Sequence, residues 1–182
     1  MKQYNELIQK ILTEGQVSSD RTGVGTISIF GEQIKFDMSE GFPAVTTKKL
    51  AWKSVVSELL WFLQGSTNVN ELRAILHGEE NRFNPDKKTI WDENYEAQGQ
   101  ALGYTGGELG PVYGAQWRGR CDHRVDQVAW LLERAERLPD CRRLIVSAWN
   151  PSEIDEMALP PCHYGFQLRI QGDVAHLLWN QR

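Results

Sequence analysis

The sequence is poor in cysteine, and it lacks both long apolar runs and a basic excess. Its 3 cysteines are an odd number at irregular spacing, so neither a disulfide framework nor a Cys-x-x-Cys metal site is indicated. No spacing of His, Cys and Asp matches a zinc template. The polar, periodic N-terminus lacks the apolar core of a signal peptide, and no run approaches membrane-spanning length. We therefore expect a protein of the reducing cytoplasm, without a metal and not in a membrane.

The charge balance argues against a partner that is a polyanion. The formal net charge is −4, whereas non-specific nucleic-acid binding needs a broad positive surface. RNA or DNA is therefore not an expected partner, although a local anion site stays open. With 41% hydrophobic residues in 182 positions, the chain is long enough for one core, and we expect a single domain over residues 1–182.

Apolar periodicity predicts a mixture of helices and strands. Apolar side chains at helical spacing predict helices over residues 4–12, 51–64, 69–76 and 125–135. Strand-like segments are expected over residues 27–38, 144–147, 162–170 and 174–180, the last two as a hairpin. Because these elements do not alternate strictly, the pattern is typical of an α+β fold.

Three further expectations concern burial and loops. The helix over residues 51–64 is apolar nearly all round, so we expect it to be buried. The polar segment 77–88 is predicted to be an exposed loop. Glycines crowd the segment that ends at Trp117, which predicts an irregular loop that holds Tyr113 and Trp117.

Three places have residues that could carry chemistry. Cys162 follows two prolines that stiffen the backbone, but a single cysteine is more often structural than nucleophilic. Arg142 and Arg143 precede a strand and suit a phosphate, or they form an ordinary surface pair. Glu58 is the acidic group of the buried-looking helix. Either it is desolvated, with a raised pKa and a role in proton transfer, or it pairs with an arginine at the helix boundary.

Eight motifs in order give the sequence a resemblance along its full length. They are DRTGVGT from Asp20, GFPAVTTKK from Gly41, SELLWFLQGSTN from Ser57, TIWDEN from Thr89, GELGPVYGAQWR from Gly107, DCRRLIVSAWNP from Asp140, MALPPCH from Met157 and NQR from Asn180. In this combination the chain resembles the N-terminal two-thirds of a thymidylate synthase. The resemblance implies an α+β fold with a mixed β-sheet packed by helices, truncated at the C-terminus.

The resemblance implies a methyltransferase that converts dUMP to dTMP. Its co-substrate would be 5,10-methylenetetrahydrofolate, which gives both the carbon and the hydride. The implied catalytic residues are Cys162 as nucleophile, with Glu58, Tyr113 and His163. The implied phosphate ligands are Arg21, Arg142, Arg143 and Arg182. The implied folate-binding residues are Ile90, Trp91 and Leu159.

The same resemblance implies an assembly and leaves alternatives open. The family forms homodimers in which the residues at Arg142 and Arg143 reach the partner's site. The family's sequence continues beyond the position of Arg182 with sugar-reading and lid segments, so we expect these 182 residues to be inactive alone. The alternatives are a pyrimidine nucleotide hydroxymethylase of the same superfamily, or a non-catalytic fragment of a split gene.

Overall fold

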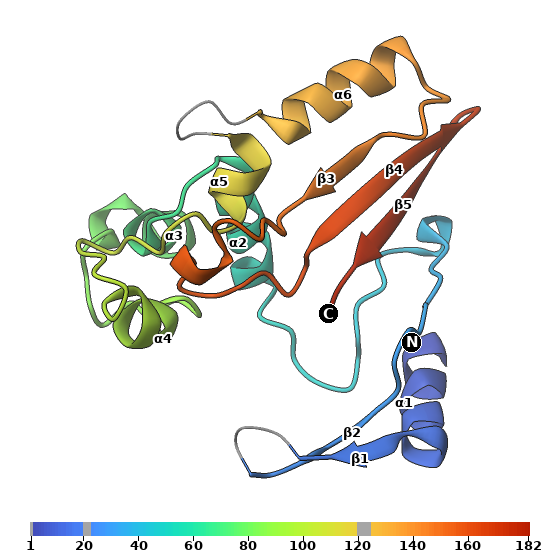
Figure 1. The fold of residues 1–182 in the computed structure, drawn as a ribbon, viewed down its shortest axis with the longest axis horizontal. Coiled ribbons are helices and arrows are strands. Elements are labelled where there is room, and N and C mark those ends of the chain that lie inside the picture. Colours follow the sequence, from blue (N-terminus) through green and yellow to red (C-terminus); the bar gives the residue numbers. More distant parts are fainter. Residues whose placement is uncertain (1, 20–22, 120–124) are drawn as a thin grey trace. The chain divides into compact units, whose positions relative to one another are not determined.

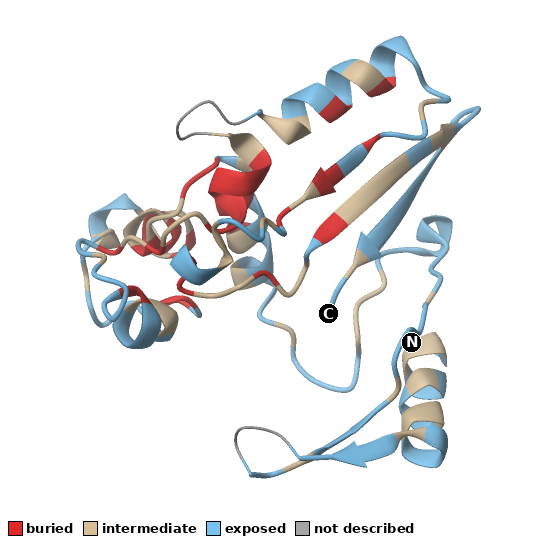
Figure 2. Cartoon of the chain, viewed as in Figure 1, coloured by how far each residue is buried: buried red, intermediate tan, exposed pale blue. Residues whose placement is uncertain are grey.

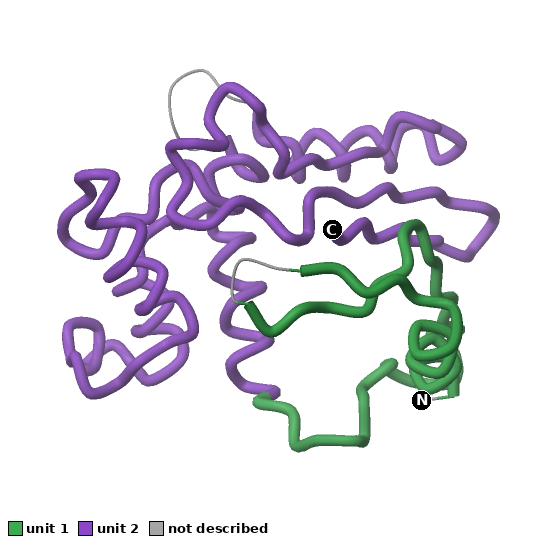
Figure 3. The backbone as a smooth tube through the Cα atoms, turned by 60° about the horizontal axis from the view of Figure 1, so that its bottom comes forward, with its two compact units in different colours: residues 1–51 green, residues 52–182 purple. Residues whose placement is uncertain are grey.

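The computed structural model describes residues 2–19, 23–119 and 125–182. By its internal contacts the chain forms two compact units, residues 1–51 and residues 52–182 (Figure 3). The expectation of one domain over the whole chain stays a prediction.

The first unit begins with the predicted amphipathic helix, α1 (Lys2–Glu14). Two three-residue strands follow, β1 (Gln16–Ser18) and β2 (Thr26–Ser28), which pair antiparallel with Val17 opposite Ile27. The predicted strand over residues 27–38 is wrong beyond its first two residues, and a 3-10 turn, η1, covers Met38–Glu40. Among the described residues the segment after β2 has no partner strand, so its alternating pattern forms no ladder.

The second unit opens with two helices at the predicted positions, α2 (Trp52–Leu63) and α3 (Val69–His77). A 3-10 turn, η2 (Glu79–Asn81), which was not predicted, lies inside the polar segment. The Asn68 side chain caps α3 by accepting from the Asn70 N–H, at 2.9 Å. A short helix, α4 (Asp92–Asn94), runs into a π-helical turn, η3 (Tyr95–Gly99).

The prediction that α2 is buried is wrong for much of its apolar surface. Trp61 and Phe62 are 0% and 5% exposed, whereas Val55, Leu59 and Leu60 are each more than two-fifths exposed. The neighbours of α2 in this unit, α3 and α5, cover only part of its surface. The apolar pattern therefore predicted the position of the helix, but not how much of its surface is buried against other elements.

The glycine-rich segment also departs from its prediction, because its last residues form a helix. Helix α5 spans Tyr113–Arg118 and is buried over most of its length (Figure 2). Gly114 allows this placement, since a Cβ atom there would lie 2.2 Å from the Ser66 carbonyl oxygen. Tyr113 and Trp117 are thus held by a helix of the core and not by an irregular loop.

The rest of the unit is a helix and a three-stranded sheet (Figure 1). Helix α6 (Gln127–Arg137) packs against α5 and against strand β3 (Ile145–Ser147). A 3-10 turn, η4 (Ile154–Glu156), precedes strands β4 (Gly165–Gln171) and β5 (Val174–Asn180). The sheet is antiparallel in the order β3-β4-β5, and Gly172 turns the predicted hairpin with a φ of 58°. The α+β class is therefore confirmed.

Aromatic rings form the centre of the core in this unit. The Phe62 ring lies 4.3 Å from that of Tyr113 and 5.6 Å from that of Trp117, measured between centroids. Trp61 and Trp91 meet edge to face at 5.4 Å. Edge-to-face and tilted contacts of this kind fix ring orientation as well as burying area. The polar groups described next are held against this aromatic core.

Candidate active site

Glu58 projects from α2 into a partly buried position beside Trp91. Its Oε1 atom accepts a hydrogen bond from the Trp91 indole Nε1–H at 2.6 Å. Burial raises the pKa of the Glu58 carboxyl, while the indole hydrogen bond and the nearby His163 act in the opposite direction. Among the described residues no arginine forms an ion pair with Glu58, so of the two sequence interpretations the structure favours the desolvated carboxyl.

Tyr113 is 4% exposed at the start of α5. Its hydroxyl oxygen accepts a hydrogen bond from the backbone N–H of His163 at 3.1 Å. Burial raises the pKa of the Tyr113 phenol, so the hydroxyl keeps its proton at neutral pH and has that proton to donate. The hydroxyl therefore links the aromatic core to the segment that carries Cys162 and His163.

The His163 ring is oriented by a residue that the sequence did not single out, Trp179 of β5. The Trp179 Nε1–H donates to His163 Nδ1 at 3.1 Å, and the Trp179 ring stacks on Phe166 of β4. Because Nδ1 accepts, the neutral ring carries its proton on Nε2. Burial lowers the pKa of His163 below its ordinary value. The alternation of side chains along the last strand was the available sequence signal for Trp179. That alternation does not predict that the Trp179 indole contacts His163.

Cys162 lies on a segment that Arg182 ties down by three hydrogen bonds. The Arg182 backbone N–H donates to the Cys162 carbonyl oxygen at 3.0 Å. The guanidinium Nε and Nη2 donate to the carbonyl oxygens of Pro161 and Pro160, each at 3.1 Å. The guanidinium carbon also lies 5.9 Å from the ring centroid of Trp149. A free, half-buried thiol is thus carried by a backbone with little freedom.

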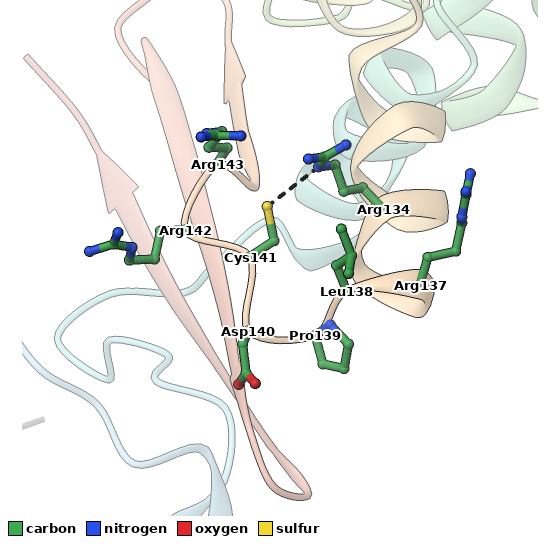
Figure 4. Close-up of a pocket in the computed structure, with 8 residues that line it drawn as sticks. All are labelled: Arg134, Arg137, Leu138, Pro139, Asp140, Cys141, Arg142 and Arg143. Carbon is green, nitrogen blue, oxygen red and sulfur yellow. Dashed lines mark hydrogen bonds between the residues drawn. The ribbon is translucent and has the colours of Figure 1, made fainter.

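A second group of polar residues lines a cavity of about 410 Å³ at the end of α6 (Figure 4). Arg134, Arg137, Arg142 and Arg143 line this cavity together with the free thiol of Cys141, and the Arg137 and Arg142 guanidinium groups point away from that thiol. The Arg134 Nε–H donates to Cys141 Sγ at 3.4 Å, and this hydrogen bond is the main cause that lowers the pKa of the thiol. We call these five residues the arginine corner.

Arg142 and Arg143 are exposed, and within the described ranges neither guanidinium forms an ion pair or donates a hydrogen bond to a protein atom. In the described part of the chain, no hydrogen bond or ion pair joins the arginine corner to the residues around Cys162. The structure therefore brings together Glu58, Tyr113, Cys162, His163 and Arg182, and it leaves Arg142 and Arg143 apart from them.

The remaining predicted site residues differ in exposure. Ile90 is 76% exposed, whereas Trp91 is 3% exposed and faces Glu58. Leu159 is partly buried against the core. Arg21 lies outside the described residues.

Among the described residues, no group of three or more His, Cys, Asp or Glu side chains could hold a metal ion. None of the described helices is both long and apolar enough to cross a membrane.

Comparison with known proteins identifies the family. The thymidylate synthase family model matches residues 2–182. The whole chain is 53% identical to the thymidylate synthase of Enterobacteria phage T4 and 52% identical to a probable thymidylate synthase of Escherichia phage T5. The crystal structure of the T4 phage enzyme superposes on the whole chain with a TM-score of 0.92. The chain therefore belongs to the thymidylate synthase family, and it spans 62% of the T4 protein's length and 63% of the T5 protein's length.

Proposed function

We propose that the chain is the greater part of a thymidylate synthase subunit that methylates dUMP to dTMP. The observation that best supports this is the anchored Cys162 beside the paired Tyr113 and His163, with the Arg182 guanidinium next to it. A nucleophile on a restrained backbone, with hydrogen-bonding groups and a cation close by, suits covalent attack on a ring held by its phosphate. Family membership supports the proposal that this ring is the uracil of dUMP.

Cys162 is the proposed nucleophile. Its thiolate would form a bond to C6 of the uracil ring, and the electron pair of the C5–C6 double bond would move to C5 and the C4 carbonyl. C5 then becomes a carbon nucleophile toward the one-carbon unit. The proposed co-substrate, 5,10-methylenetetrahydrofolate, supplies that unit and the hydride that completes the methyl group.

Glu58, Tyr113 and His163 have proposed supporting roles. A carboxyl whose pKa is raised by burial gives up its proton less readily than an ordinary carboxyl, which suits Glu58 for proton transfer at the ring. The Tyr113 hydroxyl keeps one proton to donate while it accepts from the His163 N–H. We place the folate against Ile90, Trp91 and Leu159. Of the three, Ile90 has the most accessible surface.

Phosphate binding is proposed for four arginines, with two supplied by another subunit. Arg182 uses Nε and Nη2 to hold the cysteine segment, and Nη1 is the nitrogen that we assign to a phosphate oxygen. Arg142 and Arg143 would complete the site of a partner in a homodimer, with Arg21 as the fourth ligand. Planar guanidinium groups match phosphate geometry. Both described cysteines are free thiols, which agrees with a cytoplasmic setting.

The nucleophile is tested in the completed enzyme, in which this chain is extended to the full length of the family, by tritium release from C5-tritiated dUMP. Cys162→Ala should abolish release, because the covalent step is lost, while dUMP binding persists because the phosphate ligands remain. Cys141→Ala is the matched control, since it removes the other described free thiol and should leave release near that of the parent protein. Release near the parent rate from Cys162→Ala would remove this residue from the proposed role.

A further inference from the structure

Arg73 is a charged residue in a place where a charge must be fully paired. It lies on α3 and is 6% exposed. Its Nη2 forms an ion pair with Asp92, which is 5% exposed. Isolated charges are rarely buried, because water solvates them better than protein does.

The other nitrogens of Arg73 hold the loop between α3 and α4. Nε donates to the Lys87 carbonyl oxygen at 3.1 Å, and Nη1 donates to the Arg82 carbonyl oxygen at 2.9 Å and to Asn70 Oδ1. In the polar segment that was predicted to be an exposed loop, two backbone carbonyl groups thus accept hydrogen bonds from the buried Arg73 side chain.

Asp92 passes this restraint to Trp91. Its Oδ2 accepts from the Thr89 backbone N–H at 2.6 Å and from the Thr89 hydroxyl at 2.8 Å. The same hydroxyl oxygen accepts from the Trp91 backbone N–H at 3.2 Å. The backbone on both sides of Trp91 is therefore held by a network that begins at Arg73.

Trp91 in turn contacts Glu58. Its ring packs edge to face against Trp61, Phe62 and Tyr113, and its Nε1–H donates to Glu58 Oε1 at 2.6 Å. The other titratable groups that act on Glu58 or respond to it are His163 and Tyr113. One continuous path of ion pair and hydrogen bonds thus joins a buried arginine to the carboxyl of the candidate site.

We propose that Arg73 is a positioning residue, which holds the Glu58 carboxyl against the Trp91 indole by way of Asp92 and Thr89. A purely structural ion pair would stabilise the loop without affecting the state of Glu58. A positioning residue must also change how Glu58 takes up a proton. The consequence for catalysis rests on the proposed function, whereas the position of Glu58 can be measured without substrate.

The test follows the Trp91 indole N–H by NMR in protein labelled with 15N at tryptophan, across a pH titration. Trp91→Phe assigns the signal, and loss of its pH dependence in Glu58→Gln shows that it reports on Glu58. In Arg73→Met the indole is held less firmly, so its hydrogen bond to Glu58 weakens. Because that hydrogen bond lowers the carboxyl's pKa, the midpoint should rise, by about half a pH unit, a roughly threefold change in the protonation equilibrium.

Three further variants make the result specific. Asp92→Asn should move the signal as Arg73→Met does, and the double variant should add little, because both act through one path. Lys88→Met is the control, since it removes an exposed ion pair with Glu96 from the same loop and should move nothing. Arg73→Lys keeps the charge without the planar fork. Arg73→Lys should therefore shift the midpoint of the Trp91 signal in the same direction by a smaller amount. If Arg73→Met does not fold, the result for Arg73→Lys takes its place in the test.

A folded Arg73 variant whose Trp91 signal and midpoint match those of Lys88→Met would overturn the proposal. The proposed function is tested separately by the pH profile of tritium release. If the NMR midpoint moves and the kcat profile follows it, both proposals are supported. If the midpoint moves and the profile stays, the positioning role stands and the catalytic role of Glu58 fails.

Discussion

The group around Cys162 and the arginine corner differ in how their charged and polar side chains are satisfied. Glu58 is held by Trp91, His163 by Trp179, and the Cys162 segment by Arg182, all inside residues 52–182. Arg142 and Arg143 are exposed, and in the described chain their guanidinium groups form no ion pair. The first region is organised by its own chain, whereas Arg142 and Arg143 in the second present charge without a described ion-pair partner. This difference is what one expects if the arginines act on a site outside their own subunit.

The largest difference between the regions should be in stability. Phe62→Ala removes a ring that contacts Trp61, Trp91, Tyr113 and Trp117, and it should cost about 3–5 kcal/mol of unfolding free energy. Arg142→Ala, in the exposed region, should change that free energy by no more than about 0.5 kcal/mol. Urea unfolding of both variants measures this. Comparable losses would show that the arginine corner is part of the folded framework.

The next largest effect concerns substrate. Arg142→Ala should weaken dUMP binding by about 1.5–3 kcal/mol, typical of a hydrogen bond to a charged group. Calorimetric titration with dUMP measures the loss, and 2′-deoxyuridine, which lacks only the phosphate, is the matched ligand. If the variant weakens 2′-deoxyuridine binding as much as dUMP binding, the arginine does not act on the phosphate.

A smaller effect is the pH dependence that Glu58 gives to stability. Its pKa is raised by burial, so the folded state holds the proton more tightly than the unfolded state does. The stabilisation is present below the carboxyl's ordinary range and is lost as the pH rises through the raised value. Glu58→Gln, which stays neutral and keeps an acceptor for Trp91, should therefore raise Tm more at pH 8 than at pH 4. An equal change at both values would contradict the raised pKa.

The smallest effect is on thiol reactivity and leaves the fold unchanged. The Arg134 hydrogen bond lowers the pKa of Cys141, so alkylation by iodoacetamide should reach half its maximal rate at a lower pH than for an ordinary thiol. Arg134→Ala should move that midpoint upward, and Arg137→Ala, which leaves the hydrogen bond intact, serves as the control. Peptide mass spectrometry follows Cys141 alone. Identical profiles in all three proteins would show that the arginine corner does not affect the thiol.

Local signals in the sequence predicted much of the fold. Helix α3 and the β4–β5 hairpin follow from periodicity and from Gly172, because both depend on neighbours close in the chain. The strand predicted over residues 27–38 was largely wrong, since apolar alternation indicates a strand but not whether a partner strand exists. Helix α5 was missed because its glycine serves close packing against Ser66, a contact from a distant part of the chain.

The candidate site was predictable to a different degree. The desolvation of Glu58 followed from its position on an apolar helix, but its partner Trp91 is 33 residues away and no local pattern points to it. The roles of Cys162 and the arginines came from resemblance to a family, because a position after two prolines does not by itself indicate that a cysteine is a nucleophile. The roles of Trp179 and Arg73 were missed for the same reason as the hydrogen bond between Trp91 and Glu58, since long-range contacts define what these residues do.

The central claim is that Arg142 serves the site of a partner subunit while Cys162 serves its own. The most direct test mixes inactive Cys162→Ala subunits of the completed enzyme with Arg142→Ala subunits, at a dUMP concentration too low for the Arg142→Ala protein. A mixed dimer then has one site with both an intact Cys162 and an intact Arg142 from the other chain. The account predicts that tritium release returns, at one competent site per mixed dimer. If Arg142 acted within its own subunit, no site would hold both residues, and the absence of any recovery in verified mixed dimers would contradict the account.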